Sequence, residues 1–116
     1  MRVILMGTPE FAVPSLCALA DTFEVALVIT RPDAVRGRGK RLEPSPVKAE
    51  AVSRGIEVIE ANRMTPEVLD AMRAVSADII CVAAYGCILP DTVLEMAPLG
   101  CVNVHASLLP RWRGAA

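Results

Sequence analysis

The residues of this chain whose types and spacing could support catalysis gather in the segment CVNVHASLLP (101–110). Asn103 and His105 stand two positions apart at the end of a run of β-forming residues, and such side chains project to the same side of a strand. An amide donor beside an imidazole can stabilise a developing oxyanion and assist proton transfer. A lone histidine at a strand end is more often structural, but this one is the chain's only histidine, so the pattern makes the pair the candidate catalytic residues.

A basic segment, RPDAVRGRGKR (31–41), is the second candidate site. It carries five cations and one acid in a chain whose net charge is −1, so the rest of the chain is clearly acidic. This asymmetry indicates a polyanionic partner that meets the protein at one place. A solvated loop is the alternative that composition leaves open. The segment has no aromatic residue for base stacking, which favours contacts to a phosphate backbone from Arg36, Arg38, Lys40 and Arg41.

Two common cofactor classes are disfavoured by the remaining motifs. MGTPEF (6–11) follows the first apolar run where a dinucleotide fingerprint would stand, but it offers Gly7 alone instead of three glycines. The four cysteines form no C-x-x-C pair, and one histidine makes a structural zinc site improbable. We therefore expect no dinucleotide and no metal, and we expect Cys81 and Cys101 to be reduced, buried thiols.

The elements that must position these residues alternate between apolar runs and helical patterns. Ser45 before Pro46 and Thr65 before Pro66 predict two helix starts, because each pairs an N-cap residue with a proline in the first turn. Strands are predicted at 2–6, 24–30, 56–60, 77–84 and 101–104, and helices at 11–20, 46–54, 66–74 and 91–96. The alternation predicts a doubly wound α/β fold with a mostly parallel sheet, whose ligands collect at the carboxyl ends of the strands.

Two connections and the overall composition complete this prediction. The stretch 31–45 is the only long irregular one, and AAYGCILP (83–90) leaves a strand at its carboxyl end, where Gly86 would allow a sharp turn or the close approach of a ligand. An ordinary strand-to-helix connection is the simpler interpretation of that second stretch. With 53% apolar residues but no membrane-length apolar run and no signal peptide pattern, we expect a cytoplasmic globular domain without a membrane partner.

Taken together, GTPEFAVPSL, RPD…GRGKRLEPSPVK, AAYGCILP and GCVNVHASLLPRWRGAA resemble the methionyl-tRNA formyltransferase family over essentially the whole chain. The resemblance implies transfer of a formyl group from 10-formyltetrahydrofolate to the α-amino group of methionyl initiator tRNA. It gives Asn103 the role of oxyanion donor and His105 that of assisting charge and proton movement. It also implies that the basic segment meets the tRNA, and that folate is bound by Ser107, Leu108, Leu109 and Pro110 with a second wall from Tyr85, Gly86, Cys87 and Ile88.

Other expectations follow from how this sequence differs from the family pattern. Many relatives have glycine where Ala106 stands, a change that we expect to be tolerated. The family's catalytic aspartate and its C-terminal β-barrel domain have no counterpart in residues 1–116, so we expect a partial N-terminal Rossmann-like formyltransferase domain that is inactive alone. An exposed sheet edge near residue 101 would favour self-association. Alternatives are a formyltransferase acting on a small amine, such as a glycinamide ribonucleotide or an amino-sugar nucleotide, and a non-catalytic RNA- or folate-binding module.

Overall fold

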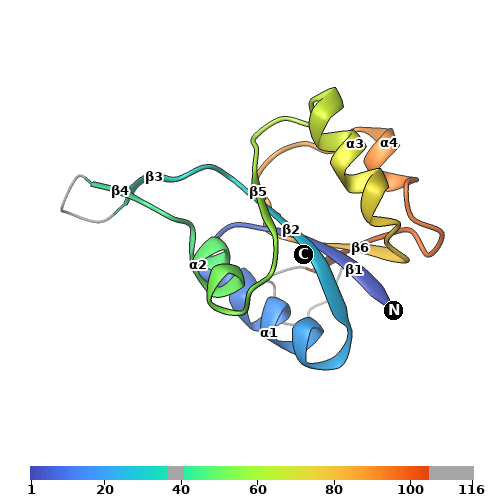
Figure 1. The fold of residues 1–116 in the computed structure, drawn as a ribbon. Coiled ribbons are helices and arrows are strands. Elements are labelled where there is room, and N and C mark those ends of the chain that lie inside the picture. Colours follow the sequence, from blue (N-terminus) through green and yellow to red (C-terminus); the bar gives the residue numbers. More distant parts are fainter. Residues whose placement is uncertain (37–40, 105–116) are drawn as a thin grey trace, which may run out of the picture.

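A parallel five-stranded sheet forms the centre of the computed structural model, which describes residues 1–36 and 41–104. Helices cover both of its faces (Figure 1). The order across the sheet is β5-β2-β1-β6-β7. The chain thus builds outward in one direction from β1 and then returns to continue in the other, which is the predicted doubly wound α/β arrangement. The strands are β1 (Arg2–Gly7), β2 (Glu24–Thr30), β5 (Val58–Glu60), β6 (Ile79–Ala83) and β7 (Cys101–Val104).

Alternating side chains along the strands supply two separate apolar cores. On β1, Ile4 and Met6 pack on one face, whereas Val3 and Leu5 pack on the other, and all four are fully buried. The first face is covered by α3 (Pro66–Val75) and α4 (Asp91–Leu94), and the second by α1 (Val13–Thr22) and α2 (Pro46–Ser53). Burial on both faces explains why the strands are nearly continuous apolar runs.

The helices begin where the sequence predicts. The Ser45 side chain accepts a hydrogen bond from the backbone N–H of Lys48 at 2.9 Å, and Thr65 accepts one from Val68 at 3.3 Å. These two residues therefore cap α2 and α3 as expected. Pro14 lies in the first turn of α1, which follows a short 3-10 turn, η1 (Glu10–Ala12), so that helix starts two residues later than predicted.

The prediction that residues 31–45 are irregular throughout is wrong. Ala34–Arg36 forms β3 and Arg41–Glu43 forms β4, and the two strands pair antiparallel with Arg36 opposite Arg41. Figure 1 shows these strands extending away from the helices and the main sheet. Three-residue strands with charged residues fall below what apolar periodicity can reveal, so no strand was expected here.

The sheet edge lies where the sequence predicts it, and the prediction of buried thiols is confirmed for Cys81 but not in full for Cys101. β7 is the end strand of the sheet beside β6, so the predicted edge near residue 101 is present among the described residues. All four cysteines are free thiols. Cys81 is buried and Cys101 partly buried, and burial raises the pKa of both. In the part of the chain that the structure describes, no helix has both the length and the apolar character to cross a membrane.

Candidate active site at the carboxyl ends of the strands

The carboxyl ends of β1 and β6 meet where the sheet changes its direction of growth, and this is where doubly wound folds bind ligands. Gly7 ends β1 directly beside Ala83 of β6. A Cβ at position 7 would lie 2.7 Å from the carbonyl oxygen of Ala83 and 3.0 Å from the Ala12 Cβ. Glycine is therefore required for this close approach, which explains the single glycine of the MGTPEF motif.

Hydrogen bonds from Thr8 join three of the connecting segments at this switch point. Its hydroxyl donates to the backbone carbonyl of Tyr85 at 3.0 Å and accepts from the backbone N–H of Arg31 at 3.2 Å. The segments after β1, β2 and β6 are thereby held together by one side chain. The sequence analysis did not select Thr8, although its position directly after a strand was a usable signal.

Tyr85 is a core residue as much as a site residue. Its side chain is 1% exposed, and its hydroxyl donates to the backbone carbonyl of Ala61 after β5. Burial, followed by the nearby Cys87 thiol, raises its pKa to about 12, so the phenol stays protonated as a donor. Any contact of Tyr85 with folate would thus have to come from its backbone.

The rest of the predicted folate wall is a sharply turned connection. Ala84 and Gly86 both have positive φ, 57° and 99°, and a Cβ on Gly86 would lie 3.2 Å from the Arg31 side chain. Cys87 packs partly buried against the core, whereas Ile88 is 97% exposed. A positive φ at a non-glycine residue marks local backbone strain of the kind found at functional sites. Folate binding by residues 85–88 stays a prediction.

Asn103 lies in register with Val82 of β6, two positions beyond Cys101 on the same face of the sheet. That face is the one on which Tyr85 and Cys87 pack. Asn103 is exposed, so its amide is available to a ligand on this face near the carboxyl rim. Its predicted partner His105 lies outside the described residues, as do Ser107, Leu108, Leu109 and Pro110 of the predicted folate site. The pairing of Asn103 with His105 therefore stays a prediction.

A polar pocket of about 240 Å³ opens on the same rim, at the root of β3. It is lined by Thr8, Arg31, Pro32, Asp33, Ala34 and Asn62, which follow the carboxyl ends of β1, β2 and β5. Residues 31–34 belong to the basic segment that the sequence predicted as a site, whereas Thr8 and Asn62 were not among the predicted site residues. Their positions could have indicated them, because each residue comes shortly after a strand that the sequence predicts.

The four basic residues predicted to meet RNA belong to the β3–β4 region. Arg36 and Arg41 form one backbone pair of the hairpin, which brings these two positions to neighbouring strands. Arg38 and Lys40 lie outside the described residues. The structure thus places two of the four on one projecting element, and RNA contact by all four stays a prediction.

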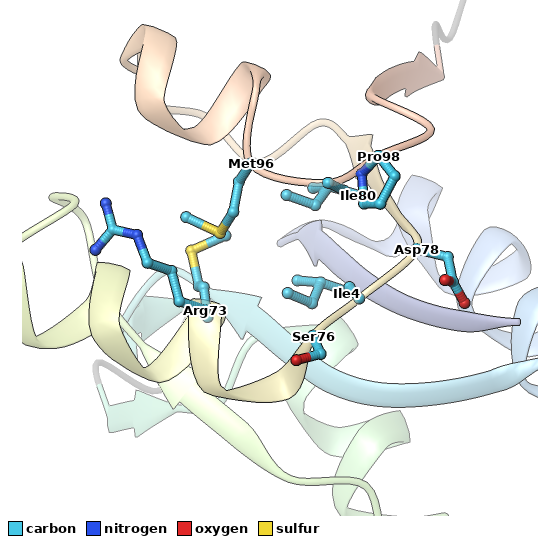
Figure 2. A pocket seen from close by; sticks show the side chains of 10 residues that line it. Ile4, Arg73, Ser76, Asp78, Ile80, Met96 and Pro98 are labelled. Carbon is cyan, nitrogen blue, oxygen red and sulfur yellow. The ribbon is translucent and has the colours of Figure 1, made fainter.

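A different pocket, of about 380 Å³, lies at the amino ends of the strands between α3 and the segment after α4 (Figure 2). Figure 2 shows Ile4, Ile80 and Met96 directed toward one space, with Arg73 extending away from it. Arg73 pairs with Asp70 at 3.2 Å, and Asp78 accepts from the backbone N–H of Arg2 at 2.8 Å. The two charged side chains that line this pocket are thus engaged with the protein itself.

The donor chemistry of the carboxyl rim consists of backbone groups, hydroxyls, amides and one guanidinium. Among residues 1–36 and 41–104, no group of three or more His, Cys, Asp or Glu side chains could hold a metal ion. An exposed amide near strained backbone can orient and polarise a carbonyl group of a bound molecule. The geometry is therefore compatible with acyl or formyl transfer that depends on hydrogen bonds.

Comparisons with known sequences agree with this chemistry. The sequence profile described as Formyl transferase matches residues 1–116. Curated relatives named methionyl-tRNA formyltransferase include those of Xanthomonas axonopodis pv. citri (strain 306), 57% identical, and Xylella fastidiosa (strain M23), 55% identical. Both alignments cover all of this chain but only 38% of the relative, so the chain spans well under half the length of these proteins.

Solved structures support the fold. Glycinamide ribonucleotide transformylase 1 from Geobacillus kaustophilus aligns with a TM-score of 0.64 at 20% identity, covering 98% of this chain and 62% of that one. The enzyme of the same name from Symbiobacterium toebii also gives 0.64 at 20% identity, covering 99% of this chain and 56% of its own. At this identity the likeness concerns the arrangement of strands and helices alone.

Proposed function

This chain belongs to the formyl transferase family, and on that premise we propose that it supplies the formyl-transferring domain of a methionyl-tRNA formyltransferase. The donor would be 10-formyltetrahydrofolate and the acceptor the α-amino group of methionyl initiator tRNA. The reaction would take place in the cytoplasm. The observation that carries the proposal is the 57% identity, over the whole chain, to a protein with that name. The Rossmann-like sheet and its polar carboxyl rim support it.

In this proposal Asn103 stabilises charge as the transfer proceeds. The amine nitrogen of the acceptor forms a bond to the formyl carbon, and the bond from that carbon to the folate nitrogen breaks. The amine loses one proton, and the leaving folate nitrogen takes up one. Negative charge develops meanwhile on the formyl oxygen, to which the exposed Asn103 amide donates a hydrogen bond. His105 assists the proton movement. The catalytic aspartate and the β-barrel domain implied by the resemblance would come from sequence beyond residues 1–116.

The folate would lie on the face and rim that Asn103 shares with the 84–88 connection. Gly86 is exposed although the Arg31 side chain packs against one side of it, and Ile88 offers an exposed apolar surface on which a planar ring could pack. The backbone groups near Gly86 would recognise the pterin, as would residues 107–110. These groups bind and orient the donor, and Asn103 donates a hydrogen bond to the oxygen of the transferred formyl group.

Direct assay of the complete gene product that contains residues 1–116 tests the proposal. The purified protein is incubated with 10-formyltetrahydrofolate and either methionyl initiator tRNA or glycinamide ribonucleotide, and formylated product is measured. We expect turnover with the tRNA and none with the small amine. Turnover with the small amine alone would instead support the other enzyme class, and tight RNA binding without any turnover would support a non-catalytic module.

Salt dependence provides a second test of the acceptor class. A polyanionic acceptor bound through phosphate contacts loses affinity steeply as salt rises. Replacing one phosphate-contacting cation, as in Arg38→Ala, should reduce the slope of log affinity against log salt by about one. A slope near zero for the unaltered protein would contradict the assignment of the basic segment to RNA.

A further inference from the structure

The paired strands β3 and β4, called the arm from here on, are three residues long each and expose the side chains whose burial the structure describes. Figure 1 shows the arm extending away from the body. Ala34, Glu43 and Pro44 are exposed, and Leu42 is 71% exposed. A two-stranded hairpin of this length has marginal stability by itself. The direction in which the arm points must therefore be set where it joins the body.

The two ends of the segment that contains the arm are joined by a buried hydroxyl pair. Thr30 closes β2 and Ser45 caps α2, and their side-chain oxygens are 2.6 Å apart. Both residues are fully buried. A buried polar pair of this kind is maintained because separating it would leave a hydroxyl without a partner. This contact holds the two ends of the segment together, but it does not fix the direction in which the arm points.

A cluster of three charged side chains holds the chain at Asp33, the residue just before the arm. The Lys48 ammonium lies 3.1 Å from one Asp33 carboxylate oxygen and 2.8 Å from Glu60. The other Glu60 oxygen accepts the backbone N–H of Asp33 at 3.0 Å. Asp33 immediately precedes β3, Lys48 belongs to α2 and Glu60 ends β5. The cluster thus connects the arm to two elements of the body.

The geometry of this cluster favours a positioning role over a solvated surface role. The hydrogen bonds that Lys48 donates to Glu60 and then to Asp33 raise the pKa of Lys48, so its ammonium stays charged. A network in which one carboxylate bridges a cation and a backbone N–H is directional, unlike a single exposed ion pair. Its two contacts to Asp33 restrain the backbone where the arm joins the body.

We propose that Lys48, with Asp33 and Glu60, is a positioning residue that fixes the angle of the arm so that its cations meet RNA together. This inference rests on the proposed function. An arm held in one direction loses less conformational freedom when RNA binds, so the cluster raises affinity without contacting the ligand. Lys48 acts through the arm, and the phosphate contacts come from the arm's own cations.

Variants of the complete gene product separate this role from simple charge effects. Lys48→Met should weaken binding of methionyl initiator tRNA about tenfold while leaving the salt slope unchanged, because no phosphate contact is lost. A slope reduced by about one would mean that Lys48 itself contacts phosphate, and would overturn the proposal. Arg73→Met is the matched control, since it removes a cation at the opposite rim and should change affinity little.

Glu60→Ala distinguishes the positioning role from an effect of net charge, because the two predict changes of opposite sign in RNA affinity. Removing a negative charge should strengthen binding to a polyanion if only net charge matters, whereas loss of the cluster should weaken it. Glu57→Ala, which removes an exposed carboxylate three positions earlier, reports the charge effect alone. Tighter RNA binding by Glu60→Ala, or binding equal to that of Glu57→Ala, would overturn the proposal.

Amide hydrogen exchange tests the cluster without RNA. We expect faster exchange at 34–36 and 41–43 in Lys48→Met and Glu60→Ala, with the rates of β1 and β6 unchanged, which also shows that the variants fold. Unchanged exchange in the arm would overturn the positioning role. If the unaltered protein binds no RNA, the proposed function fails, while faster exchange in the variants would still establish the cluster as the restraint on the arm.

Discussion

The two ends of the parallel sheet have opposite characters, although the same strands and helices build them. At the amino ends, the 380 Å³ pocket has an apolar floor, and its charged residues are paired with neighbouring protein groups. At the carboxyl ends, the smaller pocket is polar, the backbone is strained at Ala84, and one threonine joins three connections. If the proposed function is correct, the convergence of polar groups indicates the functional site better than the size of the cavity does.

The reason for this difference lies in the connections. Each parallel strand enters the sheet from a helix and leaves it into the next connection, so the carboxyl rim gathers segments that are free to vary. The 84–90 connection and the segment that carries the arm both leave from that rim. The amino rim instead receives the ends of helices, such as Ser76 after α3, whose backbone closes the helix with positive φ. Changes at the two ends should consequently have different effects.

The largest effect is expected from Asn103→Ala in the complete gene product. If the amide donates to the developing oxyanion, its loss should lower kcat about 10²–10³-fold, roughly 3–4 kcal/mol, with a small change in KM. Stability should change little because the side chain is exposed. Steady-state formylation kinetics measure this, with Met96→Leu at the amino rim as the control that should retain full activity. A kcat within threefold of the unaltered protein would remove Asn103 from the mechanism.

Gly7→Ala should cause the next largest effect, on folding instead of chemistry. The added methyl would meet the Ala83 carbonyl at 2.7 Å and the Ala12 Cβ at 3.0 Å, and neither is the flexible end of a side chain. Forcing β1 and β6 apart should lower the free energy of unfolding by about 1–3 kcal/mol. Urea denaturation measures the change. An unaltered midpoint of denaturation would show that β1 and β6 are loosely packed at Gly7, and that this close approach does not require glycine.

The sequence predicted the elements much better than the contacts that join them. Apolar runs and the Ser45 and Thr65 caps placed the strands and helices within two residues, because these depend on local periodicity and local hydrogen bonds. The exposed position of Asn103 at the predicted rim follows from the strand order.

What the sequence did not predict depends on contacts between distant residues. The Thr30–Ser45 pair and the Lys48–Asp33–Glu60 cluster join segments that no periodicity relates. The arm was missed because its strands have three residues each and include charged ones, so they are too short for an apolar pattern to reveal. The burial of the Tyr85 side chain in the core was likewise not predicted, since residues 85–88 were assigned to the folate wall by resemblance and through their backbone groups.

Tyr85→Phe should have an intermediate effect that depends on pH. At pH 8 the variant leaves the partly buried Ala61 carbonyl without its donor, which should cost about 1–2 kcal/mol of unfolding free energy. The folded-state pKa of about 12 lies above the unfolded value near 10, so stability from the protonated phenol is complete below pH 10. It is lost as pH rises toward 12, because only the unfolded state then ionises readily.

The difference in unfolding free energy between the unaltered protein and Tyr85→Phe should therefore become smaller from pH 8 to pH 11. Urea denaturation of both proteins at each pH measures this, and the phenylalanine variant itself serves as the control for alkaline effects elsewhere. A constant gap would mean that the phenol ionises normally in the folded protein. In that case the hydroxyl would not be the buried bridge between the β5 and β6 connections.

The smallest effect is expected from Ala97→Val at the amino rim, where the change resembles Gly7→Ala but the surroundings differ. Ala97 is buried and lines the 380 Å³ pocket beside Met96 and Pro98. Two added methyl groups have space to enter, so the free energy of unfolding should stay level or rise by about 0.5–1 kcal/mol. The kcat for formyl transfer should be unchanged, because the proposed chemistry lies at the other end of the strands. A fall in kcat with an unaltered unfolding midpoint would instead give the amino-rim pocket a function, and the contrast between the two rims would not hold.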